Sequence, residues 1–303
     1  MKRQAWLCCT FFLLAAALPS CGAVSGSRHS VSFEGTEISY LDEGEKNEPA
    51  LVFIHGWSCR ADFWRFQMSA LQTRYRVIAL DLPGFGQSGK PRNRAYTMEF
   101  FSRAVKAVLD QAGVSRPVLV GHSMGYGVVL KFLAGYPGQA RGACSVDGAF
   151  FWLPEDPGAV PEWETEMKGM VEGLSGPDRE RVVRWFIGCT FYGRTPGGLR
   201  REILEAMSSA DAYAANSSMA EFIKRENWVP RTFSVPALAV YSKIPELPAD
   251  TEIELRRTFQ DLSYVEWTDT GHYLMMEQPE RFNSLLVQFL ERLENEDASA
   301  EKP

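Results

Sequence analysis

The 303-residue chain lacks several features that mark large classes of proteins. Its formal net charge is −6 and its basic residues form only isolated pairs such as Arg200-Arg201, so nucleic acid is not indicated as a partner. It has no internal repeat and no Cys/His spacing typical of a metal site. With 45% hydrophobic and 23% charged residues, it is ordinary globular material. Its length suits one large α/β domain with an inserted subdomain, or two modest domains.

Cysteine is scarce outside the N-terminal segment. Three of the six cysteines fall at positions 8, 9 and 21, which leaves Cys59, Cys144 and Cys189 for the body of the protein. Cys144 lies in a predicted strand and is expected to be a small core residue. Cys59 and Cys189 would be able to pair in an oxidising compartment, although the sequence gives no sign that they approach each other.

Residues 1–23 are typical of a secretory signal peptide. Basic residues at positions 2 and 3 precede an apolar segment, residues 5–18, and small residues follow up to Ala23. A membrane-spanning anchor is excluded, because fourteen helical residues reach only about 21 Å across a hydrocarbon core of about 30 Å.

The end of this segment leaves two outcomes open. Leu18-Pro19-Ser20-Cys21 resembles a bacterial lipobox, with proline where a small residue is usual. Lipidation of Cys21 would tether the protein to a membrane of the bacterial cell envelope. Cleavage after Ala23 would instead release a soluble periplasmic or secreted protein. Nothing in the sequence indicates the oligomeric state.

Strand and helix signals alternate through most of the remaining chain. Half-exposed strands are predicted at 31–33 and 37–41. Continuous apolar runs, which indicate strands buried on both faces, follow at 51–54, 77–80 and 118–120. Further strands are predicted at 143–146, 237–241 and 264–267. Helices are predicted between them at 61–73 and 98–112, with a closing amphipathic helix at about 279–293. This alternation predicts a mostly parallel sheet covered on both sides.

The alternation stops between about residues 151 and 232. This segment is broken by prolines at 154, 157, 161, 177 and 196, contains helical pieces, and holds four of the eight tryptophans of the chain. Its apolar side chains are expected to pack on the core and together to form an apolar pocket: Trp152, Trp163, Met167, Met170, Trp185, Phe186, Phe191, Tyr192, Met207, Tyr213, Met219 and Phe222. The charged segment 294–303 is predicted to be a disordered tail.

The most informative motif is Gly121-His122-Ser123-Met124-Gly125. It follows the apolar run at 117–120 and precedes an apolar helical stretch, which is the context of a nucleophile elbow. The flanking glycines are expected where a β-carbon would clash between strand and helix. The motif therefore predicts Ser123 as a nucleophile.

Two loops at the same sheet edge support this reading. His55-Gly56-Trp57 follows the strand at 51–54, so the Trp57 amide, together with the Met124 amide behind the serine, would form an oxyanion hole. His55 is expected to pack this loop. The loop beginning at Asp81 is expected to be structural, with its carboxylate anchoring turn amides.

A serine hydroxyl needs a base to become nucleophilic at neutral pH. The chain has only four histidines. One lies in the N-terminal linker, one packs the oxyanion loop, and His122 is the neighbour of Ser123 and cannot fold back onto its hydroxyl. His272, in Thr270-Gly271-His272-Tyr273 after the last predicted strand, is therefore the candidate base.

These motifs, in this order and spacing, resemble those of the α/β-hydrolase superfamily. The resemblance covers roughly 31–150 and 233–293. It implies an eight-stranded, mostly parallel sheet with a helical cap inserted after the sixth strand, at 151–232. It also implies a triad in the order serine, acid, histidine.

The position of the triad acid in this sequence departs from the family pattern. Family members usually carry Gly-x-x-Asp after the seventh strand, but here proline occupies the place of the aspartate in Tyr241-Ser242-Lys243-Ile244-Pro245-Glu246. Glu246, one residue further, is slightly favoured as the acid. Asp147, at the end of the sixth strand, is nearly equal, because both strand ends lie at the same edge of the sheet.

The combined prediction is a serine hydrolase that needs no cofactor and no metal. A short or medium acyl ester, or a monoacylglycerol-like lipid, is the expected apolar substrate. Cleavage of a carbon–carbon bond or of a lactone is the alternative within the same fold, and a ligand-binding module without activity is a third. Relatives that open epoxides or displace halides use aspartate at the elbow, so Ser123 argues against both of those activities.

Overall fold

The computed structural model describes residues 27–44, 49–148, 158, 160–191, 195–243 and 251–300. The predicted signal peptide and Glu246 lie outside the described residues, as do Trp152 and Tyr192. Eight strands form one sheet in the order β1-β2-β4-β3-β5-β6-β7-β8. Their bounds are β1 Ser27–Phe33, β2 Thr36–Glu43, β3 Leu51–Ile54, β4 Val77–Leu80, β5 Val118–His122, β6 Gly142–Val146, β7 Ala237–Ser242 and β8 Leu262–Trp267.

The sheet is parallel except at one end. β2 runs antiparallel to both β1 and β4, and every other neighbouring pair is parallel. β1 and β2 are joined by a two-residue turn in which Glu34 and Gly35 both have positive φ, and β1 begins before the predicted core start at residue 31. The central strands β3 and β4 are completely buried, as their uninterrupted apolar sequences predict. The predicted eight-stranded, mostly parallel sheet is confirmed.

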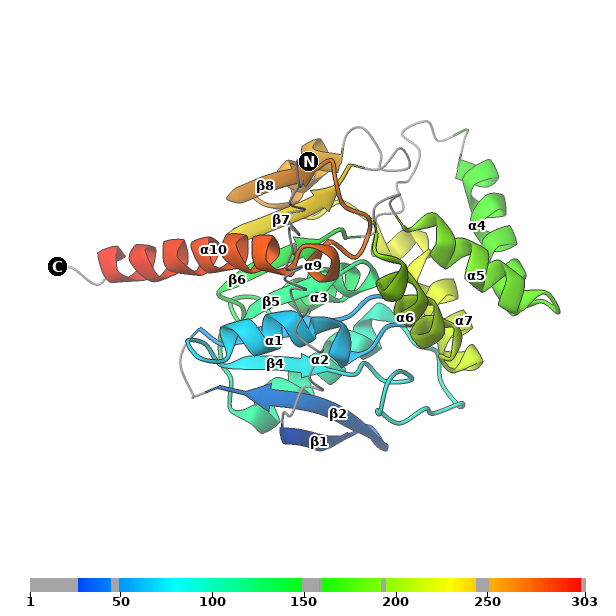
Figure 1. Cartoon of the computed structure of the whole chain (residues 1–303), viewed down its shortest axis with the longest axis horizontal. Helices are drawn as coiled ribbons and strands as arrows, with labels where there is room; N and C mark the ends of the chain where they lie inside the picture. The colour runs from blue at the N-terminus through cyan, green and yellow to red at the C-terminus, as the bar shows by residue number, and fades with distance from the viewer. Residues whose placement is uncertain are drawn as a thin grey trace, which may run out of the picture.

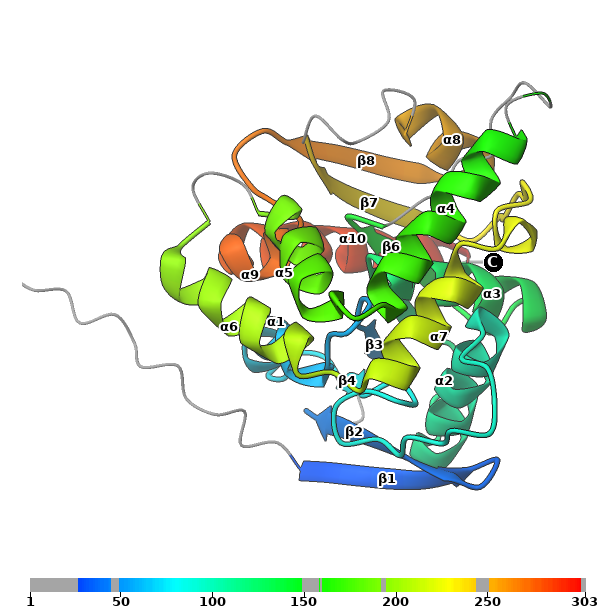
Figure 2. The same cartoon turned by 90° about the vertical axis from the view of Figure 1, so that its right-hand side faces the viewer.

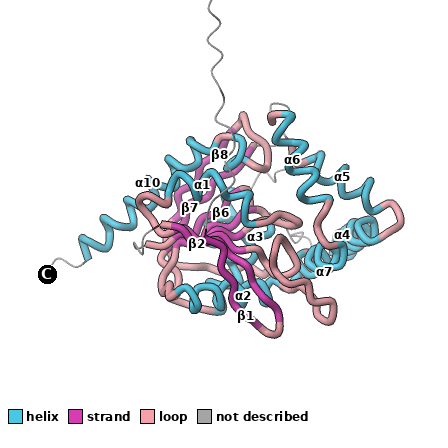
Figure 3. Tube along the Cα trace, turned by 60° about the horizontal axis from the view of Figure 1, so that its bottom comes forward, coloured by secondary structure: helices cyan, strands magenta, loops and turns pink. Residues whose placement is uncertain are grey.

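Helices cover both faces of the sheet. α1 Arg65–Leu71, which follows a 3₁₀ turn at Ala61–Trp64, packs against the long α10 Pro279–Ala300 on one face, and α2 Met98–Ala112 packs against α3 Met124–Gly135 on the other (Figure 3). α2 is capped at its start by the Thr97 hydroxyl and ends at Gly113, which has a φ of 69°. The short helices α8 Thr251–Thr258 and α9 Leu274–Glu277 complete the core.

Four helices inserted between β6 and β7 form the cap: α4 Val160–Ser175, α5 Arg179–Cys189, α6 Gly197–Ser208 and α7 Ala212–Phe222. They gather over the carboxyl ends of the central strands (Figures 1 and 2). The Trp57 indole N–H donates to the Ala215 carbonyl over 2.8 Å, and Arg65 forms an ion pair with Glu202. The cap is therefore fastened to the loop that follows β3 and to the start of α1.

The prediction of a disordered tail from residue 294 is wrong for the described part, because α10 continues to Ala300. Ion pairs hold this extension to the core, including Arg74 with Glu294 and Arg141 with Asp297. These partners are distant in sequence, so local charge density alone suggested fraying. Within the described ranges, no helix is long and apolar enough to cross a membrane.

The cysteines of the described chain are free thiols. Cys144 is fully buried in β6, which confirms it as a core residue. Cys59 is buried beside the oxyanion loop, whereas Cys189 is exposed at the end of α5. The pairing considered for these two residues is not formed.

Candidate active site

Ser123 occupies a strained turn between β5 and α3. Its φ of 52° and ψ of −122° are rare for a residue with a side chain. A β-carbon on Gly121 would lie 2.6 Å from the Gly125 carbonyl oxygen, and one on Gly125 would lie 2.4 Å from the Ile54 oxygen. Both flanking positions therefore require glycine, as the motif predicts.

Asp147 faces His272 across the carboxyl edge of the sheet. His272 Nδ1 lies 2.6 Å from Asp147 Oδ2, so the Nδ1 proton is donated to a carboxylate. This leaves His272 Nε2 as the nitrogen available for a hydroxyl proton. Asp147 itself has a φ of 44° at the end of β6. Of the two predicted acids, Asp147 is therefore in contact with His272, and Glu246 lies outside the described residues.

Asp147 is buried and fully engaged. Its Oδ1 accepts the Ser242 amide over 2.9 Å, and its Oδ2 also accepts the Ser242 hydroxyl over 3.0 Å. Its side chain is only 4% exposed, so these bonds replace the water that the carboxylate loses. The end of β7 thus contributes a serine that holds the carboxylate that follows β6. Sequence reasoning missed Ser242, although a polar residue closing an apolar strand was a signal.

His122 contacts His272, the predicted base, from the other side. Its Nε2 donates to the His272 carbonyl over 2.9 Å, and the two imidazole rings lie 4.6 Å apart. Burial, aided by nearby His272, holds the pKa of His122 well below its usual range, so this ring is neutral. His122 therefore positions the backbone of His272 and is unsuited to being the base.

The two residues predicted to form an oxyanion hole lie beside Ser123. Trp57 and Met124 line the same cavity as Ser123, and in the described part of the chain neither backbone amide is used in a backbone hydrogen bond. Met124 is the first residue of α3, so its N–H is free to meet an anion. His55 is structural, because its Nε2 accepts the Leu82 amide over 3.0 Å.

The loop after β4 is also structural, as predicted. Asp81 accepts the amides of Ala61 over 2.7 Å and Gln87 over 3.0 Å. Its Oδ2 also pairs with Arg28 at 2.9 Å. Asp81 thereby ties β1, the 3₁₀ turn and its own loop together beneath the site.

The cavity above Ser123 is small and mostly apolar. Its volume is about 60 Å³. The core contributes Ser123, His272 and the oxyanion loop, and the cap contributes the lining residues Phe186, Thr190, Met207, Met219 and Phe222. Ligand pockets are commonly roughly 300–1,000 Å³, so this one accommodates only a small group.

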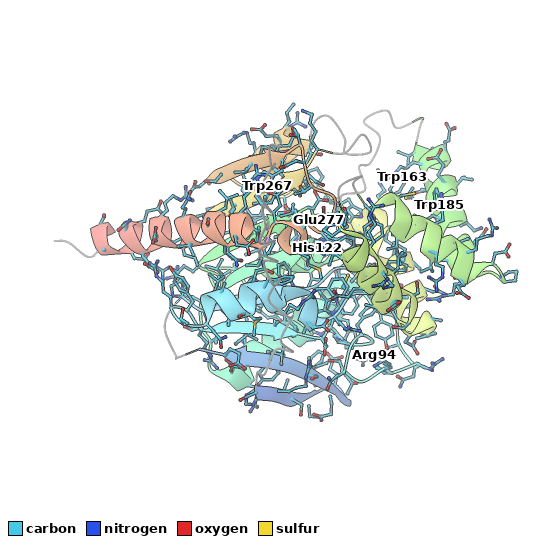
Figure 4. All side chains as sticks on the ribbon, viewed as in Figure 1. Arg94, His122, Trp163, Trp185, Trp267 and Glu277 are labelled. Atoms are coloured by element: carbon cyan, nitrogen blue, oxygen red, sulfur yellow. The ribbon has the colours of Figure 1, made fainter. Side chains whose placement is uncertain are left out.

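The predicted apolar cap residues that the structure describes lie in three kinds of surroundings. Phe186, Met207, Met219 and Phe222 line the cavity. Met167, Met170 and Phe191 are half-buried against the core instead. Trp185 is 68% exposed and lies on the outer part of the cap (Figure 4). Trp185 and Phe186 are neighbours in α5, yet one is exposed and the other lines the cavity, so apolar composition alone could not assign their roles.

Comparison with known proteins agrees with this fold. A family model described as the alpha/beta hydrolase fold matches residues 49–184. The match and the order of the strands show that the chain has the α/β-hydrolase fold. It is 27% identical over 278 residues to the AB hydrolase superfamily protein YisY of Bacillus subtilis, covering 86% of this chain and 98% of that protein.

Two further proteins are similar to the chain over most of their length. The chain is 25% identical to the 2-hydroxy-6-oxononadienedioate/2-hydroxy-6-oxononatrienedioate hydrolase of Paraburkholderia phymatum, over 84% of this chain and 92% of that protein. A solved structure titled as a membrane phospholipase A, a bacterial virulence factor, is 27% identical with a TM-score of 0.72, covering 90% of this chain and 88% of that one. The chain is a hydrolase of the α/β type. Among its described residues, no cluster of His, Cys, Asp and Glu is arranged to hold a metal ion.

Proposed function

We propose that this hydrolase cleaves short-chain carboxylic esters through an acyl-enzyme on Ser123. The observation that carries the proposal is the shared cavity of Ser123, His272 and the two free amides, with Asp147 at Nδ1 of the histidine. These groups supply the nucleophile, the base and the oxyanion donors of an acyl transfer.

In the first half-reaction, Ser123 Oγ bonds to the ester carbonyl carbon while its proton passes to His272 Nε2. The carbonyl oxygen becomes an oxyanion that accepts the Trp57 and Met124 amides. Asp147 stabilises the imidazolium that forms. The carbon–oxygen bond to the alcohol then breaks, and His272 returns its proton to the departing alkoxide.

In the second half-reaction, water takes the place of the alcohol. His272 removes a proton from the water as the oxygen bonds to the acyl carbon. The bond to Ser123 Oγ then breaks, and Oγ recovers the proton from His272. The products are a carboxylic acid and the free enzyme, and every proton is returned.

We assign the acid to Asp147. Nδ1 of an imidazole has a single proton to donate, and Asp147 Oδ2 lies 2.6 Å from it. Ser242 holds the same carboxylate in place through two hydrogen bonds, which fixes the tautomer and orientation of His272. A second acid at Glu246 has no role in this arrangement.

The cavity volume of about 60 Å³ favours a small acyl group. Phe186, Met219 and Phe222 supply an apolar surface, which suits the alkyl end of an acyl chain over a charged or sugar-like group. Longer acyl chains, such as those of a monoacylglycerol, would require these cap side chains to move.

The second candidate is hydrolysis of a carbon–carbon bond. It is favoured by the similarity to the 2-hydroxy-6-oxononadienedioate/2-hydroxy-6-oxononatrienedioate hydrolase over most of both chains. The dicarboxylate in that name would need cationic partners, and the lining of the cavity includes no lysine or arginine. The ester therefore remains the preferred substrate.

A fluorophosphonate probe tests the proposed chemistry. The folded wild-type protein should become covalently labelled, and Ser123→Ala should not. Hydrolysis of p-nitrophenyl acetate should follow the same pattern. If the wild-type protein is folded and neither labelled nor active, the proposal is wrong and a ligand-binding role gains support.

We also propose, from the sequence of residues 1–23 alone, that the enzyme is exported. Mass spectrometry of the mature N-terminus distinguishes the two outcomes. A lipidated Cys21 would indicate a membrane tether, and cleavage after Ala23 a soluble exported enzyme. An intact N-terminus would contradict both.

A further inference from the structure

The loop that carries His272 is held by the core on one side and by the cap on the other. On the core side, His122 donates to the His272 carbonyl. On the cap side, the His272 amide donates to the Thr190 carbonyl over 3.0 Å, immediately after α5. The neighbouring Tyr273 hydroxyl contacts Met207 Sδ at 2.9 Å. The place of the candidate base therefore depends on where the cap sits.

Glu277 joins the same two parts through a single oxygen. Its Oε2 accepts the Gly271 amide over 3.1 Å and the Thr195 hydroxyl over 3.0 Å. Gly271 is the residue before His272, and Thr195 lies in the cap just before α6. Figure 4 shows Glu277 at the junction of core and cap, close to the site marked by His122. We refer to Gly271, Glu277 and Thr195 as the Glu277 bridge.

The Glu277 carboxylate is costly to keep at this place. In the described part of the chain it forms no ion pair with a lysine or arginine. Burial raises the pKa of Glu277, and the hydrogen bonds from Gly271 and Thr195 oppose that rise only in part. An apolar side chain of similar size would avoid this desolvation cost. A purely structural role therefore explains the residue poorly.

We propose that Glu277 is a positioning residue that fixes the His272 loop and makes the reactive position of His272 dependent on the seated cap. The inference rests on the proposed function of His272 as the base. Thr195 connects the bridge to the cap, and Gly271 passes the constraint to the next residue, His272. A shift of about 1 Å in a catalytic group is enough to lower a rate about 100-fold. Loss of the two hydrogen bonds that hold this loop is therefore expected to lower kcat.

The bridge is tested with two pairs of variants. Glu277→Met removes the acceptor, whereas Glu277→Gln retains an oxygen that accepts both hydrogen bonds. Thr195→Val removes the donor from the cap, whereas Thr195→Ser retains it. Thr165→Val is the matched control, because the Thr165 hydroxyl bonds only within α4, to the Pro161 carbonyl. All are assayed with p-nitrophenyl acetate.

We expect Glu277→Met to lower kcat about 10- to 100-fold with KM changed less than about threefold, since binding contacts to the acyl group remain. Thr195→Val should lower kcat about three- to tenfold. Glu277→Gln, Thr195→Ser and Thr165→Val should stay within about threefold of wild type. The double variant Glu277→Met/Thr195→Val should be no slower than Glu277→Met, because both changes break one bridge.

Amide hydrogen exchange provides a readout that does not need activity. The amides of Gly271 and His272 should exchange faster in Glu277→Met and Thr195→Val, while those of β5 keep the protection seen in wild type. An unchanged kcat in both variants, or a Glu277→Gln defect as large as that of Glu277→Met, would overturn the proposal. If Glu277→Met does not fold, the kcat values of Thr195→Val and Thr195→Ser test the proposal. An inactive wild-type enzyme would refute the proposed function, and the exchange data would still report on the bridge.

Discussion

The two walls of the cavity are built in different ways. The core wall holds Ser123 and His272 at strand ends, and Asp147 behind them engages Ser242 through both carboxylate oxygens. The cap wall is mainly apolar side chains, with Phe186 and Phe222 among them. The core wall therefore consists of directional contacts and the cap wall of packing contacts.

This difference predicts a division of labour. Hydrogen bonds and backbone strain fix the atoms of the core wall within narrow limits, so a change there should remove chemistry. Apolar contacts adapt to new shapes, so a change in the cap wall should alter which substrate fits. The Glu277 bridge is where the two walls meet, since its carboxylate accepts one bond from each side.

The largest effect is expected at the acid of the core wall. Asp147→Asn should lower kcat for p-nitrophenyl acetate by about 10⁴-fold, because the amide cannot hold the required tautomer of His272 or stabilise its imidazolium. Steady-state kinetics on folded protein measures this. Glu246→Gln is the matched change at the other predicted acid and should leave kcat within about twofold. The opposite result would move the acid to the end of β7 and refute the assignment.

A second prediction concerns the backbone of the core wall. Gly125→Ala places a β-carbon 2.4 Å from the Ile54 carbonyl oxygen and 2.7 Å from that of His55. The elbow has to move, so we expect kcat to fall about 100-fold and Tm to fall by several degrees. Gly135→Ala, at the end of α3 with open space around it, is the control, and its kcat and Tm should equal those of wild type. Full activity in Gly125→Ala would show that the core wall adapts as the cap does.

The sequence predicted the core wall better than the cap wall for a physical reason. Buried parallel strands require continuous apolar runs, and the elbow requires glycines and a serine at fixed spacing, so both leave local signals. β3 and β4 accordingly have the bounds that their sequences predict. His272 was reachable by elimination because the chain has so few histidines.

The acid and the cap contacts depend on long-range pairing, which local patterns do not carry. Asp147 and His272 are separated by 125 positions, and only the neighbouring placement of β6 and β7 brings Ser242 to the same carboxylate. Thr195 and Glu277, 82 positions apart, had no signal in the sequence. Tertiary contacts of this kind become visible only when the fold is known.

The third prediction tests whether the cap wall selects substrate size. Phe186 lines the cavity, and its ring packs edge-on against Trp57 with 5.5 Å between the ring centroids. Phe186→Ala removes this ring and therefore enlarges the cavity. The ratio of kcat/KM for p-nitrophenyl octanoate to that for the acetate should rise about tenfold, within the range expected for a few methylenes in an apolar pocket. Wild type should prefer acetate or butyrate.

Trp185→Ala is the matched control for this change. Trp185 adjoins Phe186 in α5 but is 68% exposed, so its removal should leave the ratio unchanged. Equal shifts in the two variants would mean that loosening of the cap, and not the size of the cavity, controls selectivity. A wild-type preference for octanoate would contradict the inference from the cavity volume.

The smallest effect is expected for stability at the junction of the two walls. The pKa of Glu277 is raised in the folded protein because the carboxyl is buried. A raised pKa means that the folded state loses stability, relative to the unfolded chain, as the pH rises through that pKa. Gln has no proton to lose, so the Tm of Glu277→Gln minus that of wild type should increase from acid to neutral pH.

We expect this increase to be about 1–3 °C, since solvent screens a carboxylate that is only partly buried. Thermal unfolding between pH 4.5 and 7.5 measures it, and Glu280→Gln on the exposed start of α10 is the control that should show no such trend. A difference that falls with rising pH would mean that ionised Glu277 stabilises the fold. The Glu277 bridge would then be an ordinary structural contact. It would no longer link the core wall, which carries the chemistry, to the cap wall, which selects the substrate.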